Sequence, residues 1–295
     1  MLIVMRILTV CFTITTHSNK YPYAIGQTMS TELTFLGTGG GRYATIYQTR
    51  STGGLVLDTG GKRIHIDPGP GALTNMSRIG MDPTRTDAIM ISHCHPDHYS
   101  DAEVLIEGMC KGGVAKRGEL VGSVSVMEGF EGLGPRLTQY HFNMVSKHTT
   151  ARPGDEHEIC GIRTRMTASR HSDKTAVGFV FDTSDGMISY VCDTDRSDRI
   201  VNEYKGSRIL ILPITRPTRA RIKCHLCTED AVHFARTINP ELIIFNHMGV
   251  RMIGDGPEKE AAYVESATGI RTIAAKDLMN IAISSNIDVT AVKTL

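Results

Sequence analysis

An apolar run that ends in a cluster of histidines is the feature that most constrains this chain. Residues 88–91 read AIMI, and the seven that follow, SHCHPDH, hold His93, His95, Asp97 and His98. A short apolar run bounded by turn residues is typical of a buried strand. Burying four polar side chains at its end without a shared partner would be costly. Neutral imidazoles with a carboxylate suit zinc best and also accept manganese or iron, so the cluster predicts a metal site.

The remaining sequence alternates short β-rich runs with Gly-rich turns, and helical patterns appear mostly in the last third. Strands are expected at 33–37, 52–60, 62–69, 87–93, 123–128, 161–169, 176–183, 186–194, 208–214 and 241–247, and helices at 99–109, 228–240 and 257–269. Thr228 is the expected N-cap of the second of these helices, and Gly269 stops the third. The Gly- and Lys-rich stretch 111–123 is expected to be a loop. Without a fixed repeat or a Pro/Ser linker, residues 30–295 are predicted to form a single α/β domain.

The first 29 residues are predicted to be an N-terminal extension, dispensable or disordered. Residues 1–16 are apolar enough to resemble the core of a signal peptide, but Arg6 interrupts them and no clean cleavage site follows. An upstream start, with Met29 opening the domain, is the simpler explanation, and a targeting signal is the alternative. The stretch is too short and interrupted to span a bilayer, so no membrane segment is expected.

Charge and cysteine content exclude several other classes of protein. The net charge of +1 is too small to give an overall electrostatic field that would attract nucleic acid or a membrane surface. The seven cysteines are an odd number without the spacing of a secreted disulfide framework. These features predict a cytoplasmic protein.

The stretch HCHPDH resembles the motif His-x-His-x-Asp-His, which follows a strand in the metallo-β-lactamase superfamily of hydrolases. The other motifs of that family occur here in the expected order, with Asp67 in HIDPGPG, His171 in ASRHSDK, Asp193 in YVCDTD and His247 in IIFNHMG. The resemblance covers roughly residues 32–285. It implies an α/β fold of αβ/βα type, a four-layered sandwich in which two facing mixed β-sheets lie between outer helices.

The resemblance also implies two divalent metal ions, Zn²⁺ by preference, with Mn²⁺ or Fe as alternatives. The implied ligands are His93, His95 and His171 for one ion, Asp97, His98 and His247 for the other, and Asp193 between the two. Such a pair of ions activates water and clamps a substrate oxygen, and Asp97 would orient that water for attack. Asp67 is expected to orient the motif histidines through hydrogen bonds, or merely to form the turn before Pro-Gly.

Within the superfamily, the stretch CHLCTEDAVHFARTINPELIIFNH looks most like RNase Z, the tRNA 3′-processing endonuclease, and related cyclic phosphodiesterases. In that branch a histidine at the place of His225 donates a proton to the departing oxygen or stabilises the phosphoryl charge; the alternative here is that His225 caps the next helix or faces solvent. The stretch TFLGTGGG (34–41) resembles the opening of those enzymes. The residues after it are not expected to form a helix, so a dinucleotide site is not favoured.

True tRNA processing is less favoured, because residues 209–225 contain no acidic partner for His225 and no long basic arm is evident. The same interval is rich in Arg and Lys, and guanidinium groups bind phosphate in bidentate fashion. Arg216 or Arg219 is therefore expected to bind a substrate phosphate, unless the loop is simply solvated. Cys224 and Cys227 are expected to be small buried residues, without a metal-binding or redox role.

The sequence therefore predicts a dinuclear-metal phosphodiesterase with Asp97 and His225 as catalytic residues. A small anionic phosphodiester is the expected substrate, RNA a second possibility, and a homodimer is suggested only by the resemblance. The alternatives are a lactonase or thioester hydrolase with the same metals, and a diiron redox protein. The redox alternative is disfavoured because His95 stands where such sites prefer a carboxylate.

Overall fold

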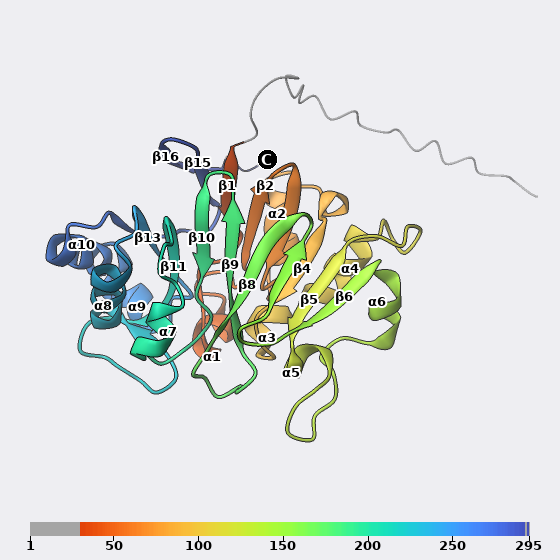
Figure 1. Cartoon of the computed structure of the whole chain (residues 1–295), viewed down its shortest axis with the longest axis horizontal. Coiled ribbons are helices and arrows are strands. Elements are labelled where there is room, and N and C mark those ends of the chain that lie inside the picture. The colour runs from red at the N-terminus through yellow and green to blue at the C-terminus, as the bar shows by residue number, and fades with distance from the viewer. Residues whose placement is uncertain (1–29, 293, 295) are drawn as a thin grey trace, which may run out of the picture.

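The computed structural model describes residues 30–292 and 294. Two β-sheets face each other, and helices cover both outer faces (Figure 1). The first sheet contains, in spatial order, β16 (Ile287–Ala291), β15 (Met279–Ile283), β1 (Thr31–Phe35), β2 (Leu55–Thr59), β3 (Lys62–Ile66), β4 (Ala88–Ile91), β5 (Glu119–Ser123) and β6 (Lys147–Ala151). The second contains β14 (Thr272–Ala274), β13 (Leu242–Asn246), β11 (Ile209–Arg216), β10 (Gly186–Tyr190), β9 (Val177–Thr183), β8 (Ile162–Ala168) and β7 (Glu156–Ile159), with β12 (Leu226–Cys227) paired to the end of β11.

The central core lies between the two sheets. Alternate residues of each strand point inward, so Leu55 and Leu57 of β2 meet Phe179 and Phe181 of β9 in one fully buried cluster. Burial of these apolar side chains between the layers holds the two sheets together.

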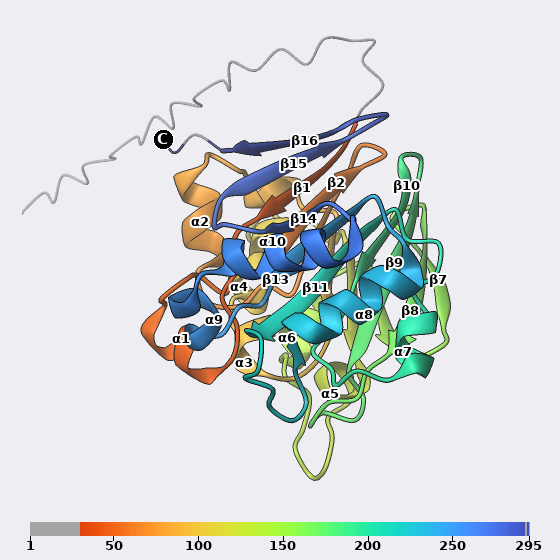
Figure 2. The ribbon, with the colours of Figure 1, turned by 90° about the vertical axis from the view of Figure 1, so that its left-hand side faces the viewer.

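Each outer face carries its own apolar cluster beneath helices (Figure 2). The first sheet is covered by α2 (Ala72–Arg78), α4 (Ala102–Met109), α5 (Val124–Met127) and α6 (Gln139–Met144). The second is covered by α7 (Asp198–Asn202), α8 (Thr228–Ile238), α9 (Val250–Asp255) and α10 (Pro257–Thr268). This arrangement confirms the predicted αβ/βα sandwich. None of the helices in the described part of the chain is long and apolar enough to cross a bilayer.

Several local predictions were wrong. Residues 124–127 form helix α5 instead of continuing a strand, because a helical turn lets Val126 and Met127 enter the same outer cluster. The predicted loop at 111–123 ends in strand β5, which lies between β4 and β6. The residues after the Gly-rich turn form a short helix, α1 (Arg42–Tyr47), in which Ala44 alone is buried. The predicted helix at 99–109 is α4, preceded by the single turn α3 (Pro96–Tyr99), and the N-cap of α8 is Cys227 instead of Thr228.

Parallel strands fix the position of the functional motifs. Strands β3, β4, β5 and β6 are parallel neighbours in the first sheet, as are β10, β11, β13 and β14 in the second. Ligands of open α/β sheets bind beyond the carboxyl ends of such strands. The loops there lie with α1, α3 and α5 at the lower end of the molecule in Figures 1 and 2. The predicted extension, residues 1–29, lies outside the described residues.

Candidate active site

All seven predicted metal ligands lie at this end of the sandwich. The first sheet supplies His93 and His95, just beyond β4, and Asp97 and His98 on α3. The second sheet supplies the other three from the loops that follow β8, β10 and β13: His171, Asp193 and His247. The site is therefore assembled from both layers.

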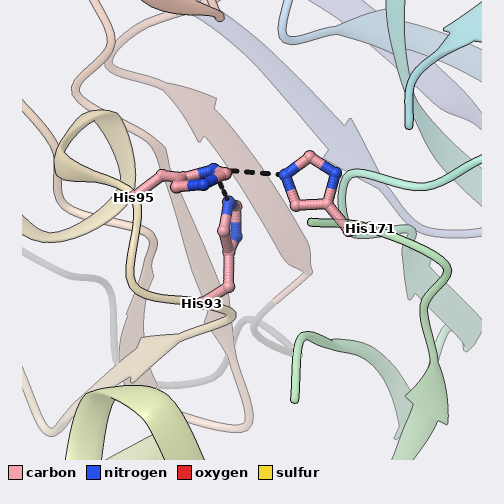
Figure 3. A group of neighbouring side chains, drawn as sticks. All are labelled: His93, His95 and His171. Atoms are coloured by element: carbon pink, nitrogen blue, oxygen red, sulfur yellow. Dashed lines mark hydrogen bonds between the residues drawn. The ribbon is translucent and has the colours of Figure 1, made fainter. Parts of the chain in front are cut away.

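Three histidines form one compact group (Figure 3). Nδ1 of His95 lies 2.9 Å from Nε2 of His93 and 3.1 Å from Nε2 of His171. Burial lowers the pKa of all three rings, to about 4 for His95, so they remain neutral near pH 7. Neutral imidazoles are the form that binds metal. The Nδ1–H of His171 is directed away from the group, toward the carbonyl oxygen of Cys224 at 2.9 Å.

Asp97, His98 and His247 form a second group. Nε2 of His247 lies 3.1 Å from Nε2 of His98 and 3.3 Å from Oδ2 of Asp97. Burial would raise the pKa of Asp97, but the nearby His98 and His247 hold it well below its usual range. This carboxylate is therefore ionised, as a metal ligand must be.

Asp193 lies between the two groups. Its Oδ2 atom is 4.0 Å from Nε2 of His171 in the first group and 3.9 Å from Nε2 of His98 in the second. Its Oδ1 atom is buried, lies 3.3 Å from Nδ1 of His247 and makes no hydrogen bond with a described residue. Burial would raise the pKa of Asp193, but His247, His225 and His98 lower it well below the usual range. A buried, ionised carboxylate with an unsatisfied oxygen is costly unless a cation pairs with it.

The donor set fits divalent metal ions. Zinc–nitrogen bonds of about 2.0–2.1 Å in tetrahedral geometry place two ligand atoms about 3.4 Å apart. The nitrogen–nitrogen separations of 2.9–3.1 Å in the two groups are close to that value. Imidazole and carboxylate donors also suit manganese and iron, so the ligands alone do not select one metal.

Asp67 holds one of the ligands in place. Its Oδ2 atom accepts a hydrogen bond from Nδ1 of His98 at 2.8 Å and one from the hydroxyl of Tyr190 at 2.7 Å. The backbone N–H and hydroxyl of Ser92 also donate to this carboxylate, at 2.6 and 2.7 Å. Burial would lower the pKa of His98, but Asp67, Asp97 and Asp193 raise it to about 10, so a divalent ion held by Nε2 would have to displace a proton from it. Asp67 thus points Nε2 of His98 toward the second group.

His225 lies beside the predicted ligands, in the loop before β12. Its Nε2 atom is 3.5 Å from Oδ2 of Asp193, and its ring meets that of His171 edge-on, with ring centroids 5.2 Å apart. Its Nδ1 atom lies 3.2 Å from the carbonyl oxygen of Lys223. Burial would lower the pKa of His225, but the hydrogen bond and charge of Asp193 raise it. The alternative that His225 caps the helix is wrong, because the N-cap of α8 is Cys227.

The Gly-rich turn at residues 37–41 is a part of the site whose role the sequence did not specify. The Gly41 N–H donates to Oδ2 of Asp97 at 3.0 Å. Gly40 packs against His247, and a Cβ atom at this glycine would lie 2.2 Å from Cγ of the imidazole. Thr215, at the end of β11, places its Oγ1 atom 3.1 Å from Nδ1 of the same histidine. In the sequence, the repeated glycines of GTGGG were the feature that could have indicated this close packing at the site.

The predicted substrate-binding arginines follow Thr215 in sequence. Arg216 is half-buried at the end of β11, and its Nε atom is buried without a hydrogen-bond partner in the described region. Arg219 is exposed, and its backbone N–H donates to Oε1 of Glu229 at 2.8 Å. Neither side chain makes a hydrogen bond or ion pair with a predicted ligand. Of the two nearby cysteines, Cys227 is buried as expected, whereas Cys224 is half-buried and contributes its carbonyl oxygen to His171.

Comparison with known proteins adds an independent finding. Residues 62–248 match the family model described as beta-lactamase superfamily domain. An uncharacterised protein of Methanocaldococcus jannaschii is 42% identical over 250 residues, which cover 84% of this chain and 93% of that protein. The ribonuclease Z of Pyrococcus furiosus is 33% identical over 78 residues, 26% of this chain and 24% of that protein.

Solved structures share the fold. The metallo-β-lactamase-fold protein YhfI from Bacillus subtilis superposes with a TM-score of 0.69 at 17% identity, over 88% of this chain and 99% of that one. A diphosphatase of the PhnP family gives a TM-score of 0.64 at 19% identity, over 86% and 98%. The family match, the fold and the clustered ligands agree: the chain belongs to the β-lactamase superfamily and is a metal-dependent hydrolase of the metallo-β-lactamase fold.

Proposed function

We propose that this hydrolase cleaves a phosphodiester. One observation carries the proposal: Oδ2 of Asp193 lies within 4.0 Å of a nitrogen from each histidine group and 3.5 Å from Nε2 of His225. A two-ion site with an imidazole at its edge suits the transfer of a phosphoryl group, in which charge develops on both the attacking and the leaving oxygen. The structural likeness to a PhnP-family diphosphatase supports the same choice.

Each predicted ligand has a place in this proposal. His93, His95 and His171 would hold one divalent ion, Asp97, His98 and His247 a second, and Asp193 would contact both. Zinc is the expected metal, with manganese or iron as alternatives. When bound, such ions lower the pKa of water and stabilise negative charge on a phosphoryl oxygen.

The side chains would then control protons and substrate orientation. Asp97, fixed by the Gly41 N–H, would accept a hydrogen bond from the attacking water and hold it in line. His225, whose pKa is raised by Asp193, would carry a proton on Nε2 and donate it to the departing oxygen. Arg216 or Arg219 would bind a non-bridging phosphate oxygen.

The test combines metal analysis with a substrate panel. Purified protein is expected to contain close to two divalent ions per chain, and Asp193→Ala to contain fewer. The metal-loaded protein should hydrolyse bis-p-nitrophenyl phosphate or a cyclic nucleotide, and Asp193→Ala should not. The panel also includes a tRNA precursor, a lactone and a thioester. Turnover of the acyl compounds alone would replace the phosphodiesterase by a lactonase or thioesterase.

A further inference from the structure

Helix α1 exposes an unusual amount of apolar surface. Tyr43, Ile46 and Tyr47 are 65%, 70% and 72% exposed, although the helix has only six residues. The rings of Tyr43 and Tyr47 are nearly parallel, with an angle of 13° between their planes and centroids 6.5 Å apart. Exposed apolar side chains that are grouped in this way mark sites of interaction.

This helix starts directly at the candidate active site. Gly40 packs against His247, and the Gly41 N–H holds Asp97. Arg42, the first residue of α1, directly follows Gly41, the residue whose N–H donates to the predicted ligand Asp97. Figures 1 and 2 both place α1 at the same end of the molecule as α3, which carries Asp97 and His98. The helix that carries the exposed tyrosines therefore starts beside the site.

Arg42 adds a cation to this surface. Its side chain is exposed and makes no hydrogen bond or ion pair with another described residue. By contrast, the Arg50 side chain on the other flank of α1 is half-buried and donates to the carbonyl oxygen of Ala275 at 2.8 Å. A guanidinium without a partner among the described residues, one position before Tyr43, suits a ligand that combines an anion with a flat ring.

We infer that α1 recognises a nucleotide, with Tyr43 and Tyr47 stacking on its base and Arg42 binding its phosphate. Aromatic side chains stack on any base because every base has a π-face. A purely apolar occupant, such as a second copy of this chain docked on α1, would leave the Arg42 charge unused. The inference names the substrate class of the proposed phosphodiesterase and in that respect rests on the proposed function, but nucleotide binding is measurable without turnover.

The direct test compares two ligands that differ only in the base. Calorimetric titration of the metal-loaded protein with AMP and with ribose 5-phosphate should give tighter binding of AMP. The double variant Tyr43→Leu/Tyr47→Leu should weaken AMP binding by roughly 5- to 150-fold, as expected for a lost stack, and leave ribose 5-phosphate unchanged. Arg42→Gln should weaken both ligands. Tyr140→Leu is the matched control, because Tyr140 is 62% exposed but lies on α6, and it should change neither.

Kinetics separate this inference from the proposed function. The p-nitrophenyl ester of thymidine 5′-phosphate and p-nitrophenyl methyl phosphate share a leaving group, and only the first carries a base. The double variant should raise KM for the first ester alone. If it changes neither KM, the phosphodiesterase stands and recognition by α1 is wrong. The other outcome is a wild type that hydrolyses no phosphodiester and still prefers AMP over ribose 5-phosphate. If the double variant then lacks this preference, the inference stands and the proposed reaction fails.

Two further results would overturn the recognition of a nucleotide by α1. Equal affinity of the wild type for AMP and ribose 5-phosphate overturns the inference. A lower molar mass for the double variant in light scattering, with unchanged AMP binding, overturns it in favour of a subunit contact through α1. Thermal unfolding of each variant checks that it is folded, and these exposed substitutions are expected to leave Tm close to that of the wild type.

Discussion

Nδ1 of His98 lies 2.8 Å from Oδ2 of Asp67, and both side chains are almost completely buried. Partners of this kind fix the orientation of metal-binding histidines, and their loss typically costs 10- to 100-fold in metal affinity. We therefore expect Asp67→Asn to reduce affinity for the metal held by His98 by about that factor, as measured by competition with a chromophoric chelator. Asp58→Asn, which breaks a surface pair with Arg63, is the control, and equal affinity in the two variants would contradict this role.

Replacing His225 should affect substrates according to their leaving group. If its imidazole donates a proton, His225→Gln lowers kcat by roughly 10²- to 10⁴-fold for an alkoxide leaving group. The effect should be small for p-nitrophenolate, which leaves without protonation. His233→Gln is the matched control, since that exposed histidine pairs with Asp198 on the surface. An equal loss on both kinds of substrate would assign His225 to binding instead of proton transfer.

Gly40 should tolerate no side chain. The Cβ of Gly40→Ala would lie 2.2 Å from Cγ of His247, and this imidazole must then move away from Asp97 and His98. We expect the variant to bind fewer metal ions per chain by elemental analysis and to lose most of its activity. Gly134→Ala is the control, because a Cβ there meets no atom within 4 Å. Full metal content in Gly40→Ala would show that the turn yields instead of the histidine.

Arg216, at the end of β11, and Arg219, after it, can be ranked by their effect on KM. Hydrogen bonds to charged groups contribute about 1.5–3 kcal/mol, so loss of a phosphate-binding guanidinium should raise KM roughly 10- to 100-fold. Arg216→Ala and Arg219→Ala are measured separately on each phosphodiester that is turned over. An unchanged KM in both variants would show that this loop is a solvated basic segment.

His65 should make the protein less stable in mild acid. It is fully buried in β3, and burial lowers its pKa from 6.5 to about 4, while its Nε2–H donates to the carbonyl oxygen of Gly53. The unfolded chain therefore binds a proton between pH 6.5 and 4 that the folded chain does not, and the free energy of unfolding falls as pH drops through this range, by about 3 kcal/mol. Urea unfolding at pH 7 and pH 5 should show a smaller difference for His65→Gln than for the wild type. An identical difference would contradict the prediction.

The seven candidate ligands could be picked out because they follow strands in a fixed motif order, and the structure brings all seven together. Of their supports, Asp67 was predicted from the resemblance, but the residues that hold Asp67 or pack on a candidate ligand were not. The hydrogen bond from Tyr190 to Asp67 joins residues 123 positions apart, and Gly40 and His247, which pack together, lie still further apart in sequence. Such contacts depend on how the two sheets are placed, which no local pattern encodes.

Secondary structure was predicted well where a long apolar run decided it, as in β11 and β13, and poorly in short elements. In α5 only four residues are helical, and their Val-Ser-Val pattern favours a strand until tertiary packing overrides it. In α1 the outward face is apolar and only Ala44 is buried, so the usual helical periodicity is missing. Both segments lie beside the site, where local preference and global fold most often disagree.

Because the first sheet provides His93 and the second provides His171, neither half of the sandwich holds a complete set of ligands. A cation bound between them would act as a noncovalent cross-link, gaining its full affinity only when the layers are docked. Folding of this enzyme and its binding of metal are therefore expected to be one cooperative event. When a chelator removes the metal, the protein is expected to unfold first at the interface between its two sheets.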